Sequence, residues 1–209
     1  MFAPATEAQL DRIVELARAT GVVRLFLQIP PTAAPAGLAE WLQDRSARPY
    51  NRWVRLYHRV QAPLRATPAT ELRVGEVGPE DAGAFARVVQ EAYGFPPAVD
   101  AWTAAAVGRE GWTHYGAWDG DELVATGAVH AARRTAWLGL AATKDSHRRR
   151  GAQSVLIAER CRKAAELGCE LLVTDTAEDR PERPAPSYRN LVRLSLTEAF
   201  RRENYLLEL

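Results

Sequence analysis

Residues 147–154 read HRRRGAQS, and they lead directly into VLIAERCRKAAEL, residues 155–167. The spacing of apolar residues in the second stretch predicts a helix, so the basic residues stand at its N-terminus. That end of a helix carries roughly half a positive charge and several unpaired N–H groups. Ser, Thr, Asp or Asn usually caps it. An anion bound there would be complementary to the arginines, and Gly151 would let it approach the backbone closely.

The competing interpretation is that these arginines are solvated, as most long charged side chains are. Their position favours the anion. The stretch follows AWLGLAAT, residues 136–143, whose composition predicts a strand, and it opens a long helix. A strand that enters a glycine-containing basic turn and then a helix is typical of an anion-binding unit.

Composition excludes several classes of protein. The 209 residues suffice for one large domain or for a domain with a smaller module. The net charge of +1 gives no overall attraction to nucleic acid or membrane. Cys161 and Cys169 lack a metal-ligand spacing and suit a reducing compartment. The chain contains no long apolar run and no apolar signal core near its start. We therefore expect a cytoplasmic protein without a metal, bound to neither membrane nor nucleic acid.

A Pro- and Ala-rich stretch, QAPLRATPATEL at 61–72, predicts a linker over residues 63–71. It separates a module at 1–62 from a domain at 72–209. In the module, Thr6 and Gln9 predict a helix with a capping box. The predicted order is α-β-α-β, with strands at 22–29 and 52–60 and a helix at 37–45. About 60 residues form only a marginal core, so we expect the module to depend on the domain or on a partner.

The predicted order in the second block is β-α-α-β-β-β-α-β-α-β-β, an α/β (α+β) arrangement. Its DGD turn at 119–121 joins two strands in a predicted hairpin. The predicted strands are 72–77, 112–118, 123–130, 136–143 and 170–176, followed by closing strands that end at residue 209. The predicted helices are 80–92, 99–107, the long helix ending at 167, and a short one from 187.

Arg148-Arg149-Arg150-Gly151-Ala152-Gln153 resembles motif A of the GNAT acyltransferase superfamily, usually written Gln/Arg-x-x-Gly-x-Gly/Ala. The element order of residues 72–209 is similar to that fold, and SYRN at 187–190 resembles a late Ser-x-x-Asn segment of bacterial members. The resemblance implies the GNAT fold, a mixed and mostly antiparallel central sheet flanked by helices. It also implies acetyl-CoA or another acyl-CoA as co-substrate.

The same resemblance implies a set of cofactor-binding residues. The diphosphate would bind the backbone amides of the basic turn, the preceding strand would pair with the pantetheine amides, and Asn190 would bond the pantetheine arm. Arg148 or Arg149 would meet the 3′-phosphate. The full set is Ala141, Ala142, Thr143, Arg148, Arg149, Arg150, Gly151, Ala152, Gln153, Ser154 and Asn190.

In the mechanism that the resemblance implies, an amine attacks the thioester directly, a base takes the amine proton and a tyrosine protonates the thiolate. Candidate bases are Asp175 and Glu178, although carboxylates at such positions are more often simply solvated. The sequence departs from the family where Arg-x-Gly-Phe is common, since it has Arg193-Leu194-Ser195-Leu196. Phe200 replaces a common tyrosine, and Tyr188 and Tyr205 are the possible substitutes, of which Tyr188 is the candidate acid.

Residues 6–60 resemble the later half of a GNAT domain, with Ser46 near a usual glycine position. This implies a tandem arrangement with a partial first half. The half lacks motif A, so we expect no second acyl-CoA site in it. An incomplete half-domain exposes strand edges, and pairing with a second copy as a homodimer is one outcome.

The leading hypothesis is an acetyl-CoA-dependent N-acetyltransferase that acts on a primary amine. The departures at Leu194, Leu196 and Phe200 motivate an alternative, a catalytically impaired relative that binds acyl-CoA. A nucleic-acid binder is the third hypothesis, and the net charge disfavours it. Small amines, amino acids, aminoglycosides and protein amines all remain as acceptors, because a fold does not fix its substrate.

Overall fold

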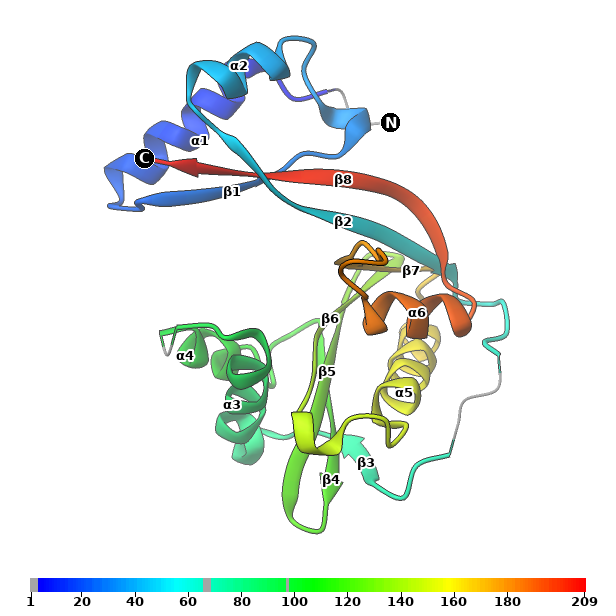
Figure 1. The fold of residues 1–209 in the computed structure, drawn as a ribbon. Coiled ribbons are helices and arrows are strands. Elements are labelled where there is room, and N and C mark those ends of the chain that lie inside the picture. Colours follow the sequence, from blue (N-terminus) through cyan, green and yellow to red (C-terminus); the bar gives the residue numbers. More distant parts are fainter. Residues whose placement is uncertain (1–3, 66–68, 97) are drawn as a thin grey trace. The chain divides into compact units, whose positions relative to one another are not determined.

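A computed structural model describes residues 4–65, 69–96 and 98–209. The protein is an α/β structure in which mostly antiparallel strands are flanked by helices (Figure 1). It divides into two compact units. Unit 1 contains Met1–Arg55, Thr176–Ala185 and Glu198–Leu209, and unit 2 contains Leu56–Asp175 and Pro186–Thr197.

Unit 2 contains a mixed sheet with the strand order β7-β6-β5-β4-β3. β3 to β6 are antiparallel neighbours, and β7 runs parallel to β6. A parallel pair needs a long crossover, which here is the helix α5 between β6 and β7. The strands are β3 (Arg73–Glu76), β4 (Trp112–Asp119), β5 (Glu122–Ala132), β6 (Thr135–Thr143) and β7 (Leu171–Ala177), whose last two residues belong to unit 1.

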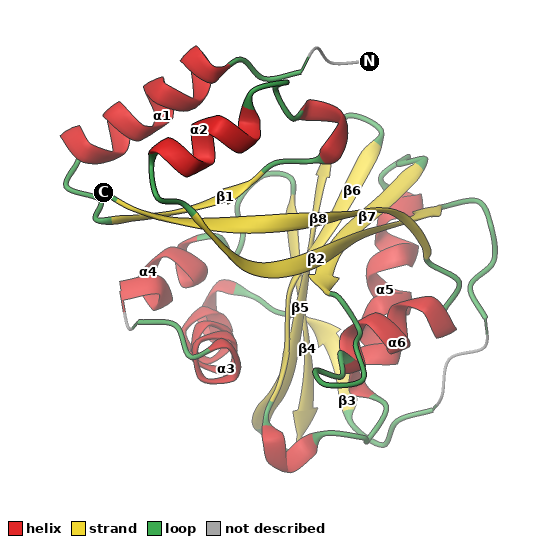
Figure 2. Cartoon of the chain, turned by 45° about the horizontal axis from the view of Figure 1, so that its top comes forward, coloured by secondary structure: helices red, strands yellow, loops and turns green. Residues whose placement is uncertain are grey.

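Helices cover both faces of this sheet. Figures 1 and 2 show α3 and α4 on one side and α5 and α6 on the other. α3 buries Phe85, Val88 and Val89 against Trp118 and Leu123 of the sheet. The helices are α3 (Ala82–Tyr93), α4 (Ala98–Ala105), α5 (Ala152–Glu166) and α6 (Pro186–Arg193), with short 3₁₀ turns η2 (Pro79–Asp81) and η3 (Asp145–His147).

Unit 1 is built around the neighbouring strands β1, β8 and β2. β1 pairs with β8 in antiparallel register, from Arg24 opposite Glu208 to Gln28 opposite Asn204. Two helices cover one face of these strands (Figure 2) and bury Trp41 and Leu207 between them and the sheet. The elements are α1 (Glu7–Ala19), β1 (Arg24–Gln28), η1 (Pro31–Ala33), α2 (Leu38–Asp44), β2 (Arg48–Arg59) and β8 (Thr197–Glu208), although the last four residues of β2 and the first residue of β8 belong to unit 2.

Most predicted elements are confirmed to within a few residues, and the Thr6–Gln9 capping box is present. The prediction of more than one closing strand is wrong, because β8 is a single strand whose residues include no Gly or Pro to break it. The two units also differ from the contiguous ranges 1–62 and 72–209, since β8 joins unit 1 by pairing with β1. Part of the predicted linker, residues 66–68, lies outside the described residues.

Candidate functional site

β6 and β7 pair only along the first part of β6. Thr135–Leu138 pair with Leu171–Thr174, and the parallel register ends there. The pairing register between β5 and β6 shifts between Thr126 and Ala128 of β5. On β6, Leu140 lies at this shift and has a left-handed φ of 50°. A bulge of this kind redirects the backbone groups of the bulged strand. The second half of β6, Gly139–Thr143, is therefore an irregular segment with an edge that β7 does not cover.

Side chains from three elements bond the carbonyl oxygens of this segment. Thr126 Oγ1 donates to Leu140 O at 3.0 Å, and the Tyr93 hydroxyl donates to Ala141 O at 3.0 Å. Gln153 Nε2 donates to Ala142 O at 2.7 Å. Neither Tyr93 nor Thr126 was among the sequence candidates. No motif marks them, because Tyr93 comes from the last turn of α3 and Thr126 from the middle of β5.

Gln153 stands where the resembling motif has a small residue. Its amide group also donates to Thr126 O at 3.0 Å and to Thr143 Oγ1 at 3.1 Å. The side chain thus points to the sheet and ties α5 to β5 and β6. The glutamine leaves the open end of the helix unobstructed, which explains how it replaces a small residue there.

The turn before α5 has the conformation of an anion cradle. Arg149 has a φ of 65° and Gly151 a φ of 83°, and no side chain caps the first turn of α5. The N–H groups of that turn are consequently unused by a cap. A Cβ on Gly151 would lie 3.0 Å from Ala69 O, so both the backbone angle and the space at this position require glycine.

The three arginines of the turn have different surroundings. Arg150 pairs with Glu71 at 2.8 Å and with Asp119 at 2.7 Å, and it holds the pKa of the Asp119 carboxyl below its usual range. Arg148 pairs with Asp145 at 2.6 Å. Within the described residues, Arg149 makes no ion pair. Arg149 is therefore the arginine of this turn whose guanidinium is available to an external anion.

Asn190 is held beside the first turn of α5 by two side chains. Ser154 Oγ donates to Asn190 Oδ1 at 2.8 Å, and Arg193 Nη2 donates to the same oxygen at 2.5 Å. Ser154 is buried, so this contact fixes α6 on α5. Because Oδ1 is used twice, the NH₂ group is the part of Asn190 that can bind a ligand, and it is a donor.

The three catalytic candidates lie in different parts of the structure. Asp175 is the first residue of β7 after the last one paired with β6. Tyr188 lies half-buried on α6 in the same unit. Glu178 belongs to unit 1, where Arg180 Nε donates to one carboxylate oxygen at 2.5 Å and Arg201 lies 3.3 Å from the other. Asp175 is consequently better placed than Glu178 to act at the parted strands.

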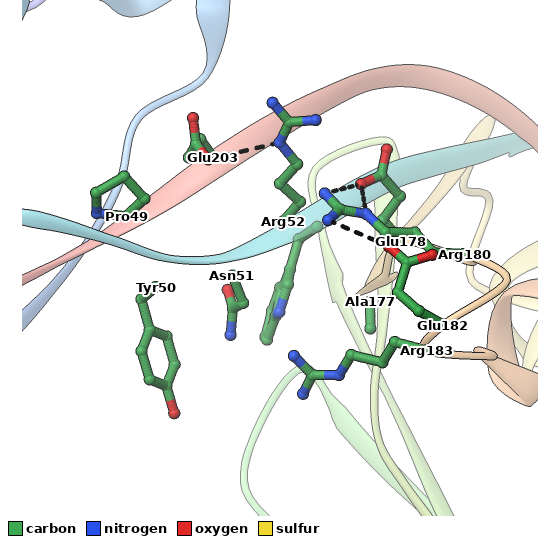
Figure 3. A pocket seen from close by; sticks show the side chains of 11 residues that line it. Pro49, Tyr50, Asn51, Arg52, Ala177, Glu178, Arg180, Glu182, Arg183 and Glu203 are labelled. Atoms are coloured by element: carbon green, nitrogen blue, oxygen red, sulfur yellow. Dashed lines mark hydrogen bonds and ion pairs between the residues drawn. The ribbon is translucent and has the colours of Figure 1, made fainter.

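In unit 1, a pocket of about 240 Å³ lies around Glu178 (Figure 3). β2 lines it from Pro49 to Trp53, the segment after β7 lines it from Ala177 to Arg183, and Glu203 of β8 completes it. In unit 2, a second hollow lies between α3 and the segment Thr143–Ser146, beside the basic turn. Segments far apart in the sequence form both hollows, so no motif marks either of them.

Three further titratable side chains of unit 2 are buried. His114 is 2% exposed and neither ring nitrogen has a partner, and this burial lowers the pKa of His114 to about 4. Cys161 and Cys169 are buried free thiols. In the described ranges, no group of three potential ligands could hold a metal, and no helix is both long and apolar enough to cross a membrane.

Comparison with known proteins connects this geometry to a family. The model of the acetyltransferase (GNAT) family matches residues 84–184, which include β4 to β7, the basic turn and α5. This match agrees with the resemblance of the sequence around the basic turn.

Solved GNAT structures share the fold of nearly the whole chain. A GCN5-related N-acetyltransferase from Sphaerobacter thermophilus has a TM-score of 0.72 at 19% identity, covering 96% of this chain and 66% of that one. One from Kribbella flavida has a TM-score of 0.70 at 20% identity, covering 98% and 77%. A tandem GNAT protein from the clavulanic acid biosynthesis pathway has a TM-score of 0.62 at 19% identity, covering 96% and 69%. No curated protein matches the sequence. At these identities the likeness is one of fold.

Proposed function

We propose that the protein is an acyl-CoA-dependent N-acyltransferase that transfers an acetyl group to a primary amine. The observation that carries the proposal is the uncapped N-terminus of α5, preceded by left-handed Arg149 and Gly151. This cradle adjoins the part of β6 that β7 leaves uncovered. An anion site next to free strand backbone is what a long diphosphate-bearing thioester requires.

In this proposal, the diphosphate accepts hydrogen bonds from the amides between Arg149 and Gln153. The N–H of Ser154 already donates to Gly151 O at 3.0 Å, so it contributes less than the earlier amides. The Arg149 guanidinium binds a phosphate group, while Arg150 supports the turn through Glu71 and Asp119. Charge-assisted bonds of this kind are about twice as strong as neutral ones.

The pantetheine arm would extend from the cradle along the uncovered edge of β6. Backbone groups of Ala141, Ala142 and Thr143 would pair with its amides, and the NH₂ group of Asn190 would donate to one of its carbonyl oxygens. The Ala141 oxygen already accepts from Tyr93, and a carbonyl oxygen has a second lone pair for a ligand. Tyr93 would therefore lie close to the bound arm.

The chemistry would depend chiefly on alignment of the two substrates. Acyl-CoA supplies the activated acyl group. The amine nitrogen attacks the thioester carbonyl carbon, the C–N bond forms and the C–S bond breaks. Asp175, placed where the strands part, would take the proton that the amine loses, and Tyr188 is the candidate to protonate the departing sulfur.

We further propose that unit 1 contains a partial repeat of the GNAT fold. Ser46 after α2 and Ser195 after α6 both have left-handed backbones, with φ of 51° and 79°. Ala47 N donates to Leu42 O at 2.9 Å, and Leu196 N donates to Leu191 O at 3.1 Å, which is the same helix ending. Two features of unit 1 differ from unit 2. Trp41 lies five residues before Ser46, whereas Asn190 lies five residues before Ser195. The Thr6–Gln9 capping box also closes the first turn of α1, whereas the first turn of α5 has no cap. Because the repeat has neither an asparagine at this position nor an uncapped helix start, we expect it to bind no second acyl-CoA.

Calorimetric titration with acetyl-CoA tests the proposal. We expect micromolar binding by the wild-type protein and about tenfold weaker binding by Arg149→Gly. Glycine adopts the φ of 65° without strain, so the change removes the guanidinium and preserves the turn. Arg133→Gly is the matched control, because Arg133 has a φ of 55° in the turn between β5 and β6.

Either of two results would contradict the site. Folded wild-type protein that does not bind acetyl-CoA would remove the proposed function. Equal affinities for Arg149→Gly and wild type would remove the assignment of the phosphate to this turn. Release of the CoA thiol measures acetyl transfer. Binding of acetyl-CoA without transfer to any amine would indicate an impaired relative.

A further inference from the structure

The pocket of unit 1 contains more charge than an ordinary surface hollow. Its lining includes the acids Glu178, Glu182 and Glu203 and the arginines Arg52, Arg180 and Arg183. Trp53 and Tyr50 add aromatic surface, and the Tyr50 ring packs on Phe26 with the centroids 4.9 Å apart. A concave site with aromatic walls and a few convergent polar groups is the usual form of a small-molecule site.

The ion pairs around the pocket include all three acids of its lining, and they include the lining arginines Arg52 and Arg180. Glu203 lies 3.5 Å from Arg52, and Glu178 is bonded by both Arg180 and Arg201. Glu182 lies 3.9 Å from Arg180. Arg183 has no ion pair within the described residues, although its backbone is fixed by bonds of 3.1 and 3.3 Å to Arg180. The pocket therefore presents one unneutralised guanidinium on an anchored loop.

Neutral donors accompany this guanidinium. Asn51 Oδ1 accepts from Asn204 Nδ2 at 2.7 Å, so the NH₂ group of Asn51 is left for a ligand. In the part of the chain that the structure describes, the Tyr50 hydroxyl bonds no other group. Figure 3 shows Tyr50, Asn51 and Arg183 on the same side of β2. Donors of this set, with a single cation, suit a carboxylate.

The pocket follows directly from the end of β7. Ala177, one of its lining residues, is the last residue of β7 and lies three positions beyond Thr174, the last residue paired with β6. Asp175 lies between these two. A ligand in this pocket would therefore lie just beyond the carboxyl end of β7.

We propose that this pocket binds the acceptor, and that the acceptor is an amine that also carries a carboxylate, such as an amino acid. The inference rests on the proposed function. Arg183 binds the carboxylate with its planar fork, and Asn51 and Tyr50 complete the set of donors. A dianionic phosphate is a poorer ligand here, because three acids share the lining. In the transfer, the amine loses one proton and the CoA sulfur gains one, so the carboxylate group is unchanged.

The test uses the full chain with acetyl-CoA and the common amino acids, each paired with its carboxamide. We expect at least one amino acid to be acetylated, with kcat/KM at least tenfold above that of its carboxamide. Arg183→Gln should lower kcat/KM for that amino acid at least tenfold, mainly through KM, and leave its carboxamide unaffected. Arg18→Gln on α1, an exposed arginine outside the lining, is the matched control.

Three results would overturn the inference. These are equal use of amino acids and their carboxamides, acetylation of simple amines only, and an unchanged KM in Arg183→Gln. The acetyl-CoA dissociation constant, measured on the same samples, keeps this test separate from the proposed function. An unchanged constant with a lost carboxylate preference removes the pocket alone, whereas wild-type protein that binds no acetyl-CoA removes the proposed function.

Discussion

At the scale of single residues, left-handed backbones mark the candidate site. Leu140, Arg149 and Gly151 all have positive φ, at 50°, 65° and 83°. For a residue other than glycine, this left-handed conformation costs roughly 1–2 kcal/mol. Such conformations persist where neighbouring structure fixes them, and they gather at binding sites. Here Thr126 fixes the bulge at Leu140, and the ion pairs of Arg150 fix the turn.

His114 gives a prediction at the same scale. Its folded pKa of about 4 lies below the ordinary 6.5, so the unfolded chain binds the extra proton between these values. The stabilisation from its neutral ring is complete above pH 6.5 and is lost as the pH falls to 4. The loss amounts to about 3 kcal/mol. Denaturant unfolding at pH 7, 5.5 and 4 should show this slope in the wild type and a smaller one in His114→Phe.

Phenylalanine keeps the ring contact with Phe85, whose centroid lies 4.9 Å from that of His114. It also removes two buried nitrogens that have no partner. We therefore expect no loss of stability at pH 7 in the variant. Identical pH slopes in the two proteins would show that another group is responsible for the acid sensitivity.

At the scale of elements, the basic turn and the first turn of α5 together connect three parts of unit 2. Gln153 reaches β5 and β6, Ser154 reaches Asn190 on α6, and Arg150 reaches the turn between β4 and β5. These side chains bond three different partners, so the start of the helix is held without a cap. The unused N–H groups are thereby kept in place for a ligand.

Gln153→Ala tests this connection. The change removes three hydrogen bonds from one amide group and leaves the oxygens of Thr126 and Ala142 without that donor. We expect the free energy of unfolding to fall by about 1–3 kcal/mol in urea titrations. Gln43→Ala on α2 is the control, because Gln43 is exposed and its side chain makes no bond in the described structure. A loss no larger than that of the control would show that Gln153 does not hold α5 on the sheet.

At the scale of the whole molecule, the two ends of the chain fold together in unit 1. β1 pairs with β8 along its length, and Leu207 of β8 is buried with Leu10, Val14 and Trp41. The N-terminal module is therefore incomplete without residues that the chain supplies last. This accounts for the expectation that about 60 residues make a marginal core.

A fragment of residues 1–62 should accordingly remain unfolded by circular dichroism. The same fragment, joined through a flexible Gly/Ser linker to residues 197–209, should gain helical signal and a cooperative thermal transition. The added strand restores the partner of β1 and the apolar contact of Leu207. Cooperative folding of residues 1–62 alone would show that β8 is not required.

Local signals in the sequence determined much of this protein. The capping box at Thr6, the Gly151 turn and the helix after it were predictable, because a helix start depends on residues within one turn. The GNAT resemblance rested on that turn and on element order, and the family match covers the same region. Asn190 and the residues of the basic turn were candidates because they belong to short stretches that resemble family motifs.

Only the tertiary structure decided which of these residues are available and what surrounds them. In the folded chain, Arg150 bonds the carboxylate of Glu71, 79 positions away in the sequence. Tyr93 bonds a backbone oxygen 48 positions away, and Asn51 bonds a side chain 153 positions away. The tertiary structure also placed β8 beside β1 and formed the pocket around Glu178 from three segments. Contacts at such separations arise from packing of the whole chain, and no spacing within a short stretch records them.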